Sequence, residues 1–376
     1  MITNPLSYLF VLAIIATFLS LLEQKTKWIF FKYIPAVVLI YAVTMFCASI
    51  GFWELNEEIN SIYKLTKTNL LPAMIFLMLL QVDIKEFFKL GRKLIIAYTL
   101  AVISIATGFI TVSVLLNFDS NMFGAFGALA GSWMGGTANM VAVGSALGVS
   151  DEAFGYALIV DSFNYTFWVA FLLFIVGFAN LFNKFTDAKP SEDVINTIGC
   201  ACNIGAKRYW VLIVLSLVVS FFSQVISQNI SIINSTTTMV VIATFSGIIA
   251  SFTKLKELNG SNEVAMSMLY MLIALIGSRA VFGSFGGVGY YVFAGFLILI
   301  IHAVIMVIGA KIFKLDLFSI CIASLSNIGG VASAPILAAT YNKKLVGVGV
   351  LMAIMGYIIG TFGGLFVGNI LEGFAK

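Results

Sequence analysis

The sequence predicts an all-α protein that crosses a membrane many times, and three observations support this fold class. Of the 376 residues, 61% are hydrophobic and only 10% are charged, whereas soluble domains carry about 25% charged residues. Apolar stretches of the length of membrane helices recur along the whole chain. A glycine-rich segment also occurs once in each half within the same order of elements, which points to two repeats, and the second is expected to be inverted because each half has five crossings, an odd number. A water-soluble protein is excluded, and the lipid bilayer is a predicted partner.

Ten apolar stretches, five in each half, are bounded by charged or turn-forming residues and are expected to cross the membrane. They cover residues 5–22, 33–51, 69–82, 94–117 and 152–180, then 209–228, 236–252, 262–280, 288–312 and 345–372. The first has no basic segment ahead of it, so we expect it to be retained. The stretch 69–82 is short and contains Pro72, which predicts a tilt or kink. We predict a first membrane repeat over 1–180, a linker over 181–208 and a second, inverted repeat over 209–376.

Two further segments, 121–148 and 316–341, are apolar but interrupted by small and polar residues, with a Gly-Gly pair near the middle of each. Backbone groups cannot face lipid unpaired, so a break at membrane depth must be buried in protein or line a wet cavity. Each segment is therefore predicted to be a glycine-rich re-entrant or discontinuous helical hairpin. The alternative is that the glycines serve only close helix packing.

The distribution of basic residues favours hairpins that return to the side from which they enter. With two such hairpins, 17 of the 21 Lys and Arg residues lie on one side, as the positive-inside rule expects of cytoplasmic loops. The linker 181–208 is then cytoplasmic, the first hairpin enters from outside and the second enters from the cytoplasm. The four basic residues on the predicted outer side are Lys64, Lys67, Arg279 and Lys376.

The polar residues near the two Gly-Gly pairs are candidate binding residues. Half-helices that meet at a break offer N–H groups to an anion and carbonyl groups to a cation. Side-chain donors and acceptors are added at the same depth by Thr137, Asn139, Ser326, Asn327 and Ser333.

Asp161 is the one acidic residue well inside a predicted span, since the other 16 lie in loops or near span ends. Nine residues separate it from Glu152, which places it about 13 Å along the helix, near the bilayer middle. No Lys or Arg is expected at that depth, so a cation or proton must balance its charge. We predict an ion-coupling site at Asp161, Ser162 and Asn164, with Na⁺ as the candidate cation. The alternative is a protonated Asp161 that hydrogen bonds to a neighbouring helix.

Several other functions are disfavoured. The net charge of +4 is small for this length, so nucleic acid is not a predicted partner. The four cysteines lack the spacing of a metal site. His302 is the single histidine and is expected to be neutral and bonded to a backbone carbonyl, with a proton relay as the alternative. No nucleophile-base pair or metal set gathers at one depth, so we predict neither an enzyme nor a resident cofactor.

The segments GSWMGGTANMVAVGSALG and SLSNIGGVASAPILAATYN, with the order of spans around them, resemble the bacterial membrane family called domain of unknown function 819. More distantly, the paired glycine-rich segments are similar to those of sodium-coupled glutamate and 2-hydroxycarboxylate carriers. That resemblance implies two hairpin tips that form a substrate and sodium site in a moving, elevator-like domain, beside a static scaffold that usually dimerises. It assigns the tips to Gly135, Gly136, Thr137, Ala138 and Asn139, and to Asn327, Gly329 and Gly330. Those carriers commonly place an Arg at the site, and neither hairpin contains one.

The predicted function is therefore secondary active transport of a small polar organic solute across the bacterial inner membrane. An amino acid, a carboxylate or a small peptide is the expected substrate class, and Na⁺ or H⁺ is the expected coupling ion. A homodimer is expected from the resemblance. The alternative is a cation/proton antiporter without an organic substrate, because a single buried carboxylate suffices for that activity.

Overall fold

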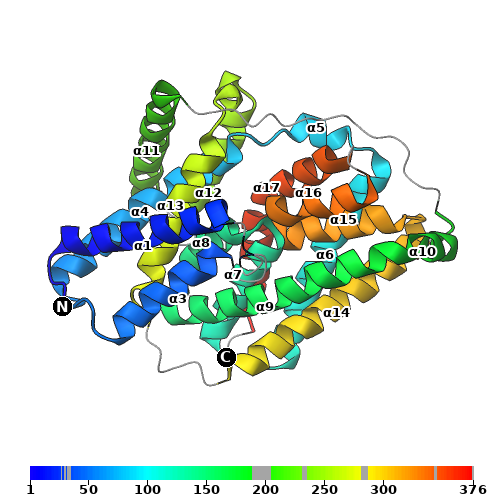
Figure 1. Cartoon of the computed structure of the whole chain (residues 1–376), viewed down its shortest axis with the longest axis horizontal. Coiled ribbons are helices and arrows are strands. Elements are labelled where there is room, and N and C mark those ends of the chain that lie inside the picture. Colours follow the sequence, from blue (N-terminus) through cyan, green and yellow to red (C-terminus); the bar gives the residue numbers. More distant parts are fainter. Residues whose placement is uncertain are drawn as a thin grey trace. The chain divides into compact units, whose positions relative to one another are not determined.

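The structure is a computed structural model that describes residues 1–26, 28, 31, 35–188, 205–230, 235–280, 287–342 and 345–374. The regular elements among these residues are helices (Figure 1), which confirms the all-α prediction. Six segments are long and apolar enough to cross a membrane: α1 (Pro5–Thr26), α6 (Arg92–Leu115), Asp151–Thr186, α11 (Ala206–Asn229), α14 (Val288–Phe313) and α17 (Val346–Glu372).

The other predicted spans also correspond to helices. The stretches 33–51, 236–252 and 262–280 contain the shorter apolar helices α3 (Ala36–Ser49), α12 (Ser235–Ser251) and α13 (Ser261–Gly277). The stretch 69–82 is the second half of α4 (Glu57–Leu79). That helix begins earlier than its apolar residues do, because the Asn56 side chain caps it by accepting the Ile59 N–H at 2.8 Å.

The remaining helices include the two glycine-rich segments. They are α5 (Ile84–Phe88), α7 (Ser120–Gly135), α8 (Thr137–Ala146), α9 (Asp151–Ile175), α10 (Ala179–Thr186), α15 (Leu317–Ile328) and α16 (Gly330–Tyr341), with 3₁₀ turns at Val176–Phe178 and Lys254–Glu257. Of the predicted linker, residues 189–204 lie outside the described part of the chain.

The chain divides into two compact units that do not follow the order of the sequence. Unit 1 comprises Met1–Gln81, Gly144–Ser162 and Asn203–Tyr291, and unit 2 comprises Val82–Val143, Phe163–Cys202 and Val292–Lys376. Unit 1 thus takes the first three predicted spans of each half. Unit 2 takes the fourth span and nearly all of the glycine-rich segment from each half, with part or all of the fifth span. Each unit therefore draws corresponding segments from both predicted repeats.

The packing inside unit 1 is interchangeable between the two halves. The helices α4 and α13 pack against each other, α4 also contacts α11 and α12, and α13 also contacts α1 and α3 (Figure 1). If α1, α3 and α4 are exchanged for α11, α12 and α13, respectively, the same set of helix contacts results. Glycines allow the close approaches: a Cβ on Gly247 of α12 would lie 2.6 Å from the Leu79 Cβ. This pattern is what a duplicated sequence is expected to give.

Both glycine-rich segments, which lie mainly in unit 2, fold back on themselves. In the first, a Cβ on Gly131 would lie 3.0 Å from the Val143 Cγ2. A continuous helix would separate residues 131 and 143 by about 18 Å. In the second, the rings of Phe318 and Tyr341, near its two ends, have centroids 5.1 Å apart. Each segment is therefore a helical hairpin, with its tip at the Gly-Gly pair.

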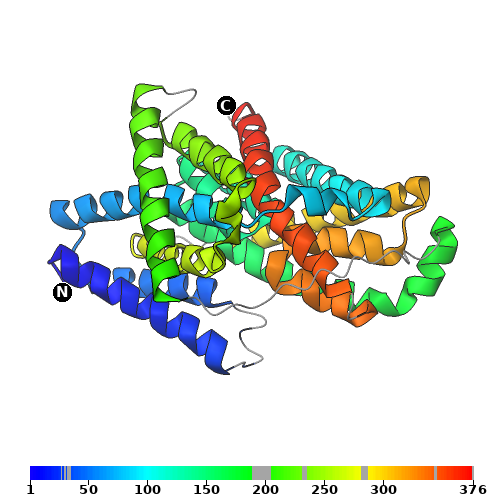
Figure 2. The same ribbon diagram turned by 90° about the horizontal axis from the view of Figure 1, so that it is seen from above.

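The last helix, α17, packs against α7 through glycines on both sides. A Cβ on Gly360 would lie 2.7 Å from the Gly131 oxygen, and one on Gly364 would lie 2.7 Å from the Gly131 Cα. A Cβ on Gly135 would overlap the Gly356 oxygen. Glycines four residues apart on both helices let the two backbones touch, as small residues do between membrane helices. The α17 helix also contacts α16 (Figure 2).

Candidate functional site

The tip of the first hairpin is tied to α17 by Asn139. This side chain is buried, its Nδ2 donates to the Gly135 oxygen at 2.7 Å, and its Oδ1 accepts from the Thr361 Oγ1 at 2.7 Å. A longer contact of 3.4 Å joins Nδ2 to the Gly356 oxygen. Asn139 thus binds a carbonyl that the end of α7 leaves open and joins it to α17.

The other predicted residues of this tip differ in what surrounds them. Gly135 lies against α17, whereas Gly136 has φ 93° and no atom within 4 Å of the position of a Cβ. Ala138 is buried and Thr137 is half-buried. Gly136 is therefore required by its backbone conformation rather than by packing, because a positive φ with an extended ψ is open to glycine almost alone.

The tip of the second hairpin gathers buried oxygen atoms that have no hydrogen-bond partner among the described residues. They are Ser326 Oγ, Asn327 Oδ1 and Ser333 Oγ. Ser326 and Asn327 are fully buried and Ser333 is 3% exposed. The Asn327 Nδ2 donates to the Ala323 oxygen at 2.8 Å, and Ser333 Oγ lies against Gly329. Buried polar atoms without partners are rare in folded proteins and often mark a bound ion, a water or a ligand.

The two tips come to the same level along α17. The chain reverses between α16 and α17, since a Cβ on Gly349 would lie 2.9 Å from the Ala334 oxygen. Gly330 precedes Ala334 by four residues, which is about 6 Å along a helix. Because Ala334 lies beside Gly349 and the two helices run in opposite directions, Gly330 lies about 6 Å beyond Gly349 along α17, within about one turn of Gly356. Gly356 is the residue that packs against Gly135. The polar atoms of the second tip therefore lie near the first tip.

The chemistry available at the tips is that of neutral oxygen ligands. Neither hairpin contains a charged residue between Ser120 and Ala146 or between Leu317 and Tyr341. Hydroxyl, amide and carbonyl oxygens are hard ligands that suit cations such as Na⁺, and they also hydrogen bond to polar solutes. Within the described residues, no group of three or more His, Cys, Asp or Glu side chains is placed to hold a metal ion.

The predicted ion-coupling residues lie on α9, as expected. Asp161 is half-buried, ten residues after the start of the helix. The Ser162 Oγ donates to the Leu158 oxygen at 3.0 Å, within its own helix. Asn164 is buried, its Nδ2 donates to the Val292 oxygen at 3.3 Å, and it fills the space beside Gly295. Asn164 thus contributes to the packing of α9 against α14.

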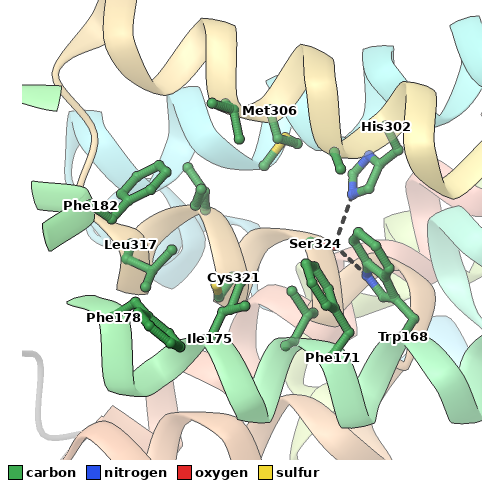
Figure 3. Close-up of a pocket in the computed structure, with 14 residues that line it drawn as sticks. Trp168, Phe171, Ile175, Phe178, Phe182, His302, Met306, Leu317, Cys321 and Ser324 are labelled. Atoms are coloured by element: carbon green, nitrogen blue, oxygen red, sulfur yellow. Dashed lines mark hydrogen bonds between the residues drawn. The ribbon is translucent and has the colours of Figure 1, made fainter. Parts of the chain in front are cut away.

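His302 lies at the centre of a hydrogen-bond network that joins four helices, and Figure 3 shows the part of it formed by His302, Ser324 and Trp168. Its Nε2 is 2.8 Å from Ser324 Oγ on α15, and its Nδ1 is 2.7 Å from Ser104 Oγ on α6. Trp168 on α9 donates its indole N–H to Ser324 Oγ at 2.9 Å, and Ser104 donates to the Ala101 oxygen at 2.8 Å. The assignment that satisfies every group protonates Nδ1 and leaves Nε2 to accept from Ser324. The expected partner of His302, a backbone carbonyl, is therefore replaced by two serines.

A cavity of about 230 Å³ begins beside this network. Figure 3 shows aromatic and aliphatic side chains around it, and Trp168, His302 and Ser324 at one end. Its other walls come from α9, the Val176–Phe178 turn, α10, α14 and α15 and are apolar, among them Phe171, Phe178, Met306, Leu317 and Cys321. An apolar cavity of this kind does not offer the polar groups that a hydrophilic solute requires.

A charged cluster in unit 1 was not predicted from the sequence. The Tyr63 hydroxyl donates to Asp151 Oδ1 at 3.0 Å, while Lys67 and Arg279 approach the same carboxylate at 3.9 and 3.8 Å. The Arg279 guanidinium also stacks over the Tyr63 ring at 4.5 Å. The sequence does contain a signal, because Lys67 and Arg279 are two of the few cations that the charge distribution places on the outer side.

Comparison with known proteins agrees with this all-helical membrane architecture. A family model described as "Protein of unknown function (DUF819)" matches residues 9–374. The chain is also 23% identical to the protein named "Uncharacterized membrane protein YjcL" from Bacillus subtilis (strain 168), over 94% of this chain and 93% of that protein. These matches confirm the family predicted from the glycine-rich segments and support a multi-pass membrane location. The chain belongs to the DUF819 family of membrane proteins.

Proposed function

We propose that this protein is a secondary active transporter that moves a small polar organic solute, coupled to Na⁺ or H⁺. The solute class is an amino acid, a carboxylate or a small peptide, and the membrane is the bacterial inner membrane. In this proposal the solute binds where the two hairpin tips come level on α17, the buried oxygens there add ligands for a cation, and Asp161 couples cation binding to transport. The distant likeness to sodium-coupled glutamate and 2-hydroxycarboxylate carriers belongs to the same proposal.

The observation that carries the proposal is the set of three buried oxygens without partners at the second tip. Each such group costs about 1–3 kcal/mol when it is left unsatisfied. Three on neighbouring turns are expected to persist only if something binds them during the working cycle. A cation coordinated by Ser326, Asn327 and Ser333, or a solute that donates hydrogen bonds to them, would satisfy all three.

The contacts of unit 1 support hairpins that begin and end on one side of the membrane. In the predicted topology the chain crosses away from Tyr63 through the apolar second half of α4, which ends at Leu79, and crosses back through α6, a candidate span of 24 residues. After the first hairpin, Asp151 again lies beside Tyr63. The Ala146 oxygen, at the end of that hairpin, accepts from Thr237 at the start of α12 at 2.9 Å. Two crossings, by α4 and α6, return the chain to the side of Tyr63. Because Asp151, after the hairpin, lies on that same side, the hairpin itself does not cross the membrane.

The composition of the two units supports a moving domain beside a scaffold. Both hairpin tips belong to unit 2, together with α17, which packs against α7 and α16. Unit 1 contains α1, α3 and α4 with their counterparts from the second half. We propose that unit 2 is the transport domain and that unit 1 is the scaffold and carries the homodimer interface. The cytoplasmic linker and the inverted orientation of the repeats are parts of this proposal.

We assign cation coupling to Asp161, with Ser162 and Asn164 beside it in sequence. A carboxylate inside a membrane helix is costly unless its charge is balanced, so cation binding there can be linked to the state of the tips. In this mechanism the bound cation stabilises the conformation that binds solute, so a larger fraction of the protein is able to bind solute when the cation is present.

The test is the thermal stability of the purified full-length protein against Na⁺, with choline as the replacement cation, in the absence and presence of amino acids, carboxylates and dipeptides. We expect Na⁺ or a change of pH to raise stability, and one solute class to raise it further. Ser333→Ala should abolish both responses, whereas Thr340→Ala, an exposed site on the same helix, should preserve them. Proteoliposomes with a pH-sensitive dye separate the antiporter alternative, which would exchange cations with no solute present. No response to any cation, pH change or solute would refute the proposal.

A further inference from the structure

A second cavity, of about 270 Å³, lies in unit 1 and differs in character from the apolar cavity beside His302. It is formed by the middle of α4, the end of α8, the end of α11 and the start of α12. Most of its lining side chains are polar: Tyr63, Lys64, Lys67, Thr68, Ser145, Gln224, Ser227, Gln228, Ser235 and Thr236, with Leu71 and Met239 as the apolar wall.

The charge of this cavity is positive. Two of its lining residues are lysines and none is acidic. The nearest carboxylate, Asp151, is shared: Lys67 lies 3.9 Å and Arg279 3.8 Å from it, and Tyr63 donates to it at 3.0 Å. One carboxylate therefore faces two cations in a half-buried cluster, so a positive charge is left over at the cavity wall. An anion in the cavity would balance it.

The position of these lysines is unusual for a membrane protein. The predicted topology places Lys64 and Lys67 of α4, the end of α11 and the start of α12 on the outer side, and the structure brings them together around one cavity. Positive residues are disfavoured in outer loops and concentrate in cytoplasmic ones. Of the four basic residues predicted on the outer side, two line the cavity, and Arg279 belongs to the adjoining cluster. Cations placed against this bias point to a binding role.

We propose that this cavity binds a small organic anion through its carboxylate, which lies between Lys67 and Lys64. The amide and hydroxyl groups of α11 and α12 would hydrogen bond to the rest of the solute. The Gln224 Nε2 is already held by Asn69 Oδ1 at 3.1 Å, so the Gln224 side chain is fixed before a ligand arrives. The site is distinct from the hairpin tips and does not depend on the transport proposal.

The size and lining of the cavity favour a small, polar carboxylate. A volume of about 270 Å³ lies just below the usual range of about 300–1,000 Å³ for ligand pockets. Lysine ammonium groups act as point charges, and uncharged polar side chains supply the remaining contacts. The apolar wall of Leu71 and Met239 leaves room for a short carbon chain.

The experiment is calorimetric titration of the full-length protein in detergent at fixed ionic strength. The probes are succinate, its neutral diamide and inorganic phosphate. We expect succinate to bind and the diamide not to bind. Lys67→Gln should weaken succinate binding about tenfold or more, because it removes a charge-assisted hydrogen bond. Lys64→Gln, at an exposed position, should weaken it about two- to fivefold.

Two controls keep the result decisive. Lys67→Arg keeps the charge and should retain most of the affinity even if Lys67→Gln folds poorly. Lys85→Gln changes an exposed lysine on α5 and should have no effect. Equal binding of succinate and its diamide would overturn the proposal, as would succinate binding that survives in both Lys67→Gln and Lys64→Gln. Binding of phosphate alone would also overturn it, because the site would not then recognise an organic anion. Loss of transport with intact succinate binding would refute only the transport function.

Discussion

Ser326→Ala is the substitution that most directly tests the meaning of the unpaired oxygens at the second hairpin tip. Ser326 is fully buried, and its Oγ has no partner among the described residues. Removing an unsatisfied buried hydroxyl relieves a cost of about 1–3 kcal/mol, against a loss of about 1 kcal/mol or less for the small void that remains. The variant should therefore be as stable as the native protein or more stable without Na⁺, and it should respond less to Na⁺.

Ser324→Ala is the matched control, two residues earlier on the same helix and also buried. Its hydroxyl is bonded to both His302 Nε2 and the Trp168 indole N–H, at 2.8 and 2.9 Å. The substitution leaves two buried polar groups without a partner, which costs about 2–6 kcal/mol. It should lower stability markedly, while the protein that remains folded keeps its full response to Na⁺.

The assay is thermal unfolding of both variants and the native protein in Na⁺ and in choline at equal ionic strength. A change of 1 kcal/mol corresponds to about 2 °C or less in a chain of this size, so the two variants should separate by several degrees in opposite directions. The reasoning fails if Ser326→Ala is destabilised as much as Ser324→Ala. It also fails if Ser326→Ala keeps the native response to Na⁺, because the unpaired hydroxyl would then have no role in cation binding.

Three further predictions follow from the hairpins and from α9. Single cysteines at Asp119 and Val149, in a cysteine-free background, should both react with an impermeant maleimide from outside; reaction at only one would mean that the segment crosses the membrane. Gly136→Ala should cost about 1–3 kcal/mol, because its φ of 93° is strained for other residues, whereas Gly330→Asn, at φ 57°, should cost less than about 1 kcal/mol in unfolding measurements. Asp161→Asn should fold and lose its response to Na⁺ and pH, and an unchanged response would place the coupling site elsewhere.

The predicted spans could be located from the sequence because membrane helices are a local property of apolar length. All ten stretches contain helices, and the kink-prone stretch around Pro72 became the second half of a longer helix capped by Asn56. The two units could not be predicted from the same pattern. They depend on which helices pack together, and those contacts join residues far apart in the chain.

The role of Asn139 shows the limit of reading residue types in a tip. Its position beside the Gly-Gly pair predicts a ligand-binding residue, and this stays a prediction. In the structure, however, its side-chain amide is already hydrogen bonded to Gly135 and Thr361. That second partner lies 222 positions later in the sequence. A local signal for the packing was available, since glycines recur every fourth position at Gly131 and Gly135, and at 356, 360 and 364. It supports the packing alternative for the first tip, while the unpaired oxygens of the second tip support binding.

The absence of charged residues from both hairpins is compatible with an anionic solute. A carboxylate needs a positive partner in a low-dielectric site, and the oxygens of Ser326, Asn327 and Ser333 suit a cation. In our proposal a bound Na⁺ supplies the positive charge that a site arginine would otherwise supply. Affinity for a carboxylate should then rise with Na⁺, and by thermodynamic reciprocity affinity for Na⁺ should rise equally with the carboxylate. For a neutral solute, the affinity should depend much less on Na⁺. Measuring how strongly Na⁺ raises solute affinity therefore distinguishes a tip that recognises the charge of the solute from one that only hydrogen bonds to it.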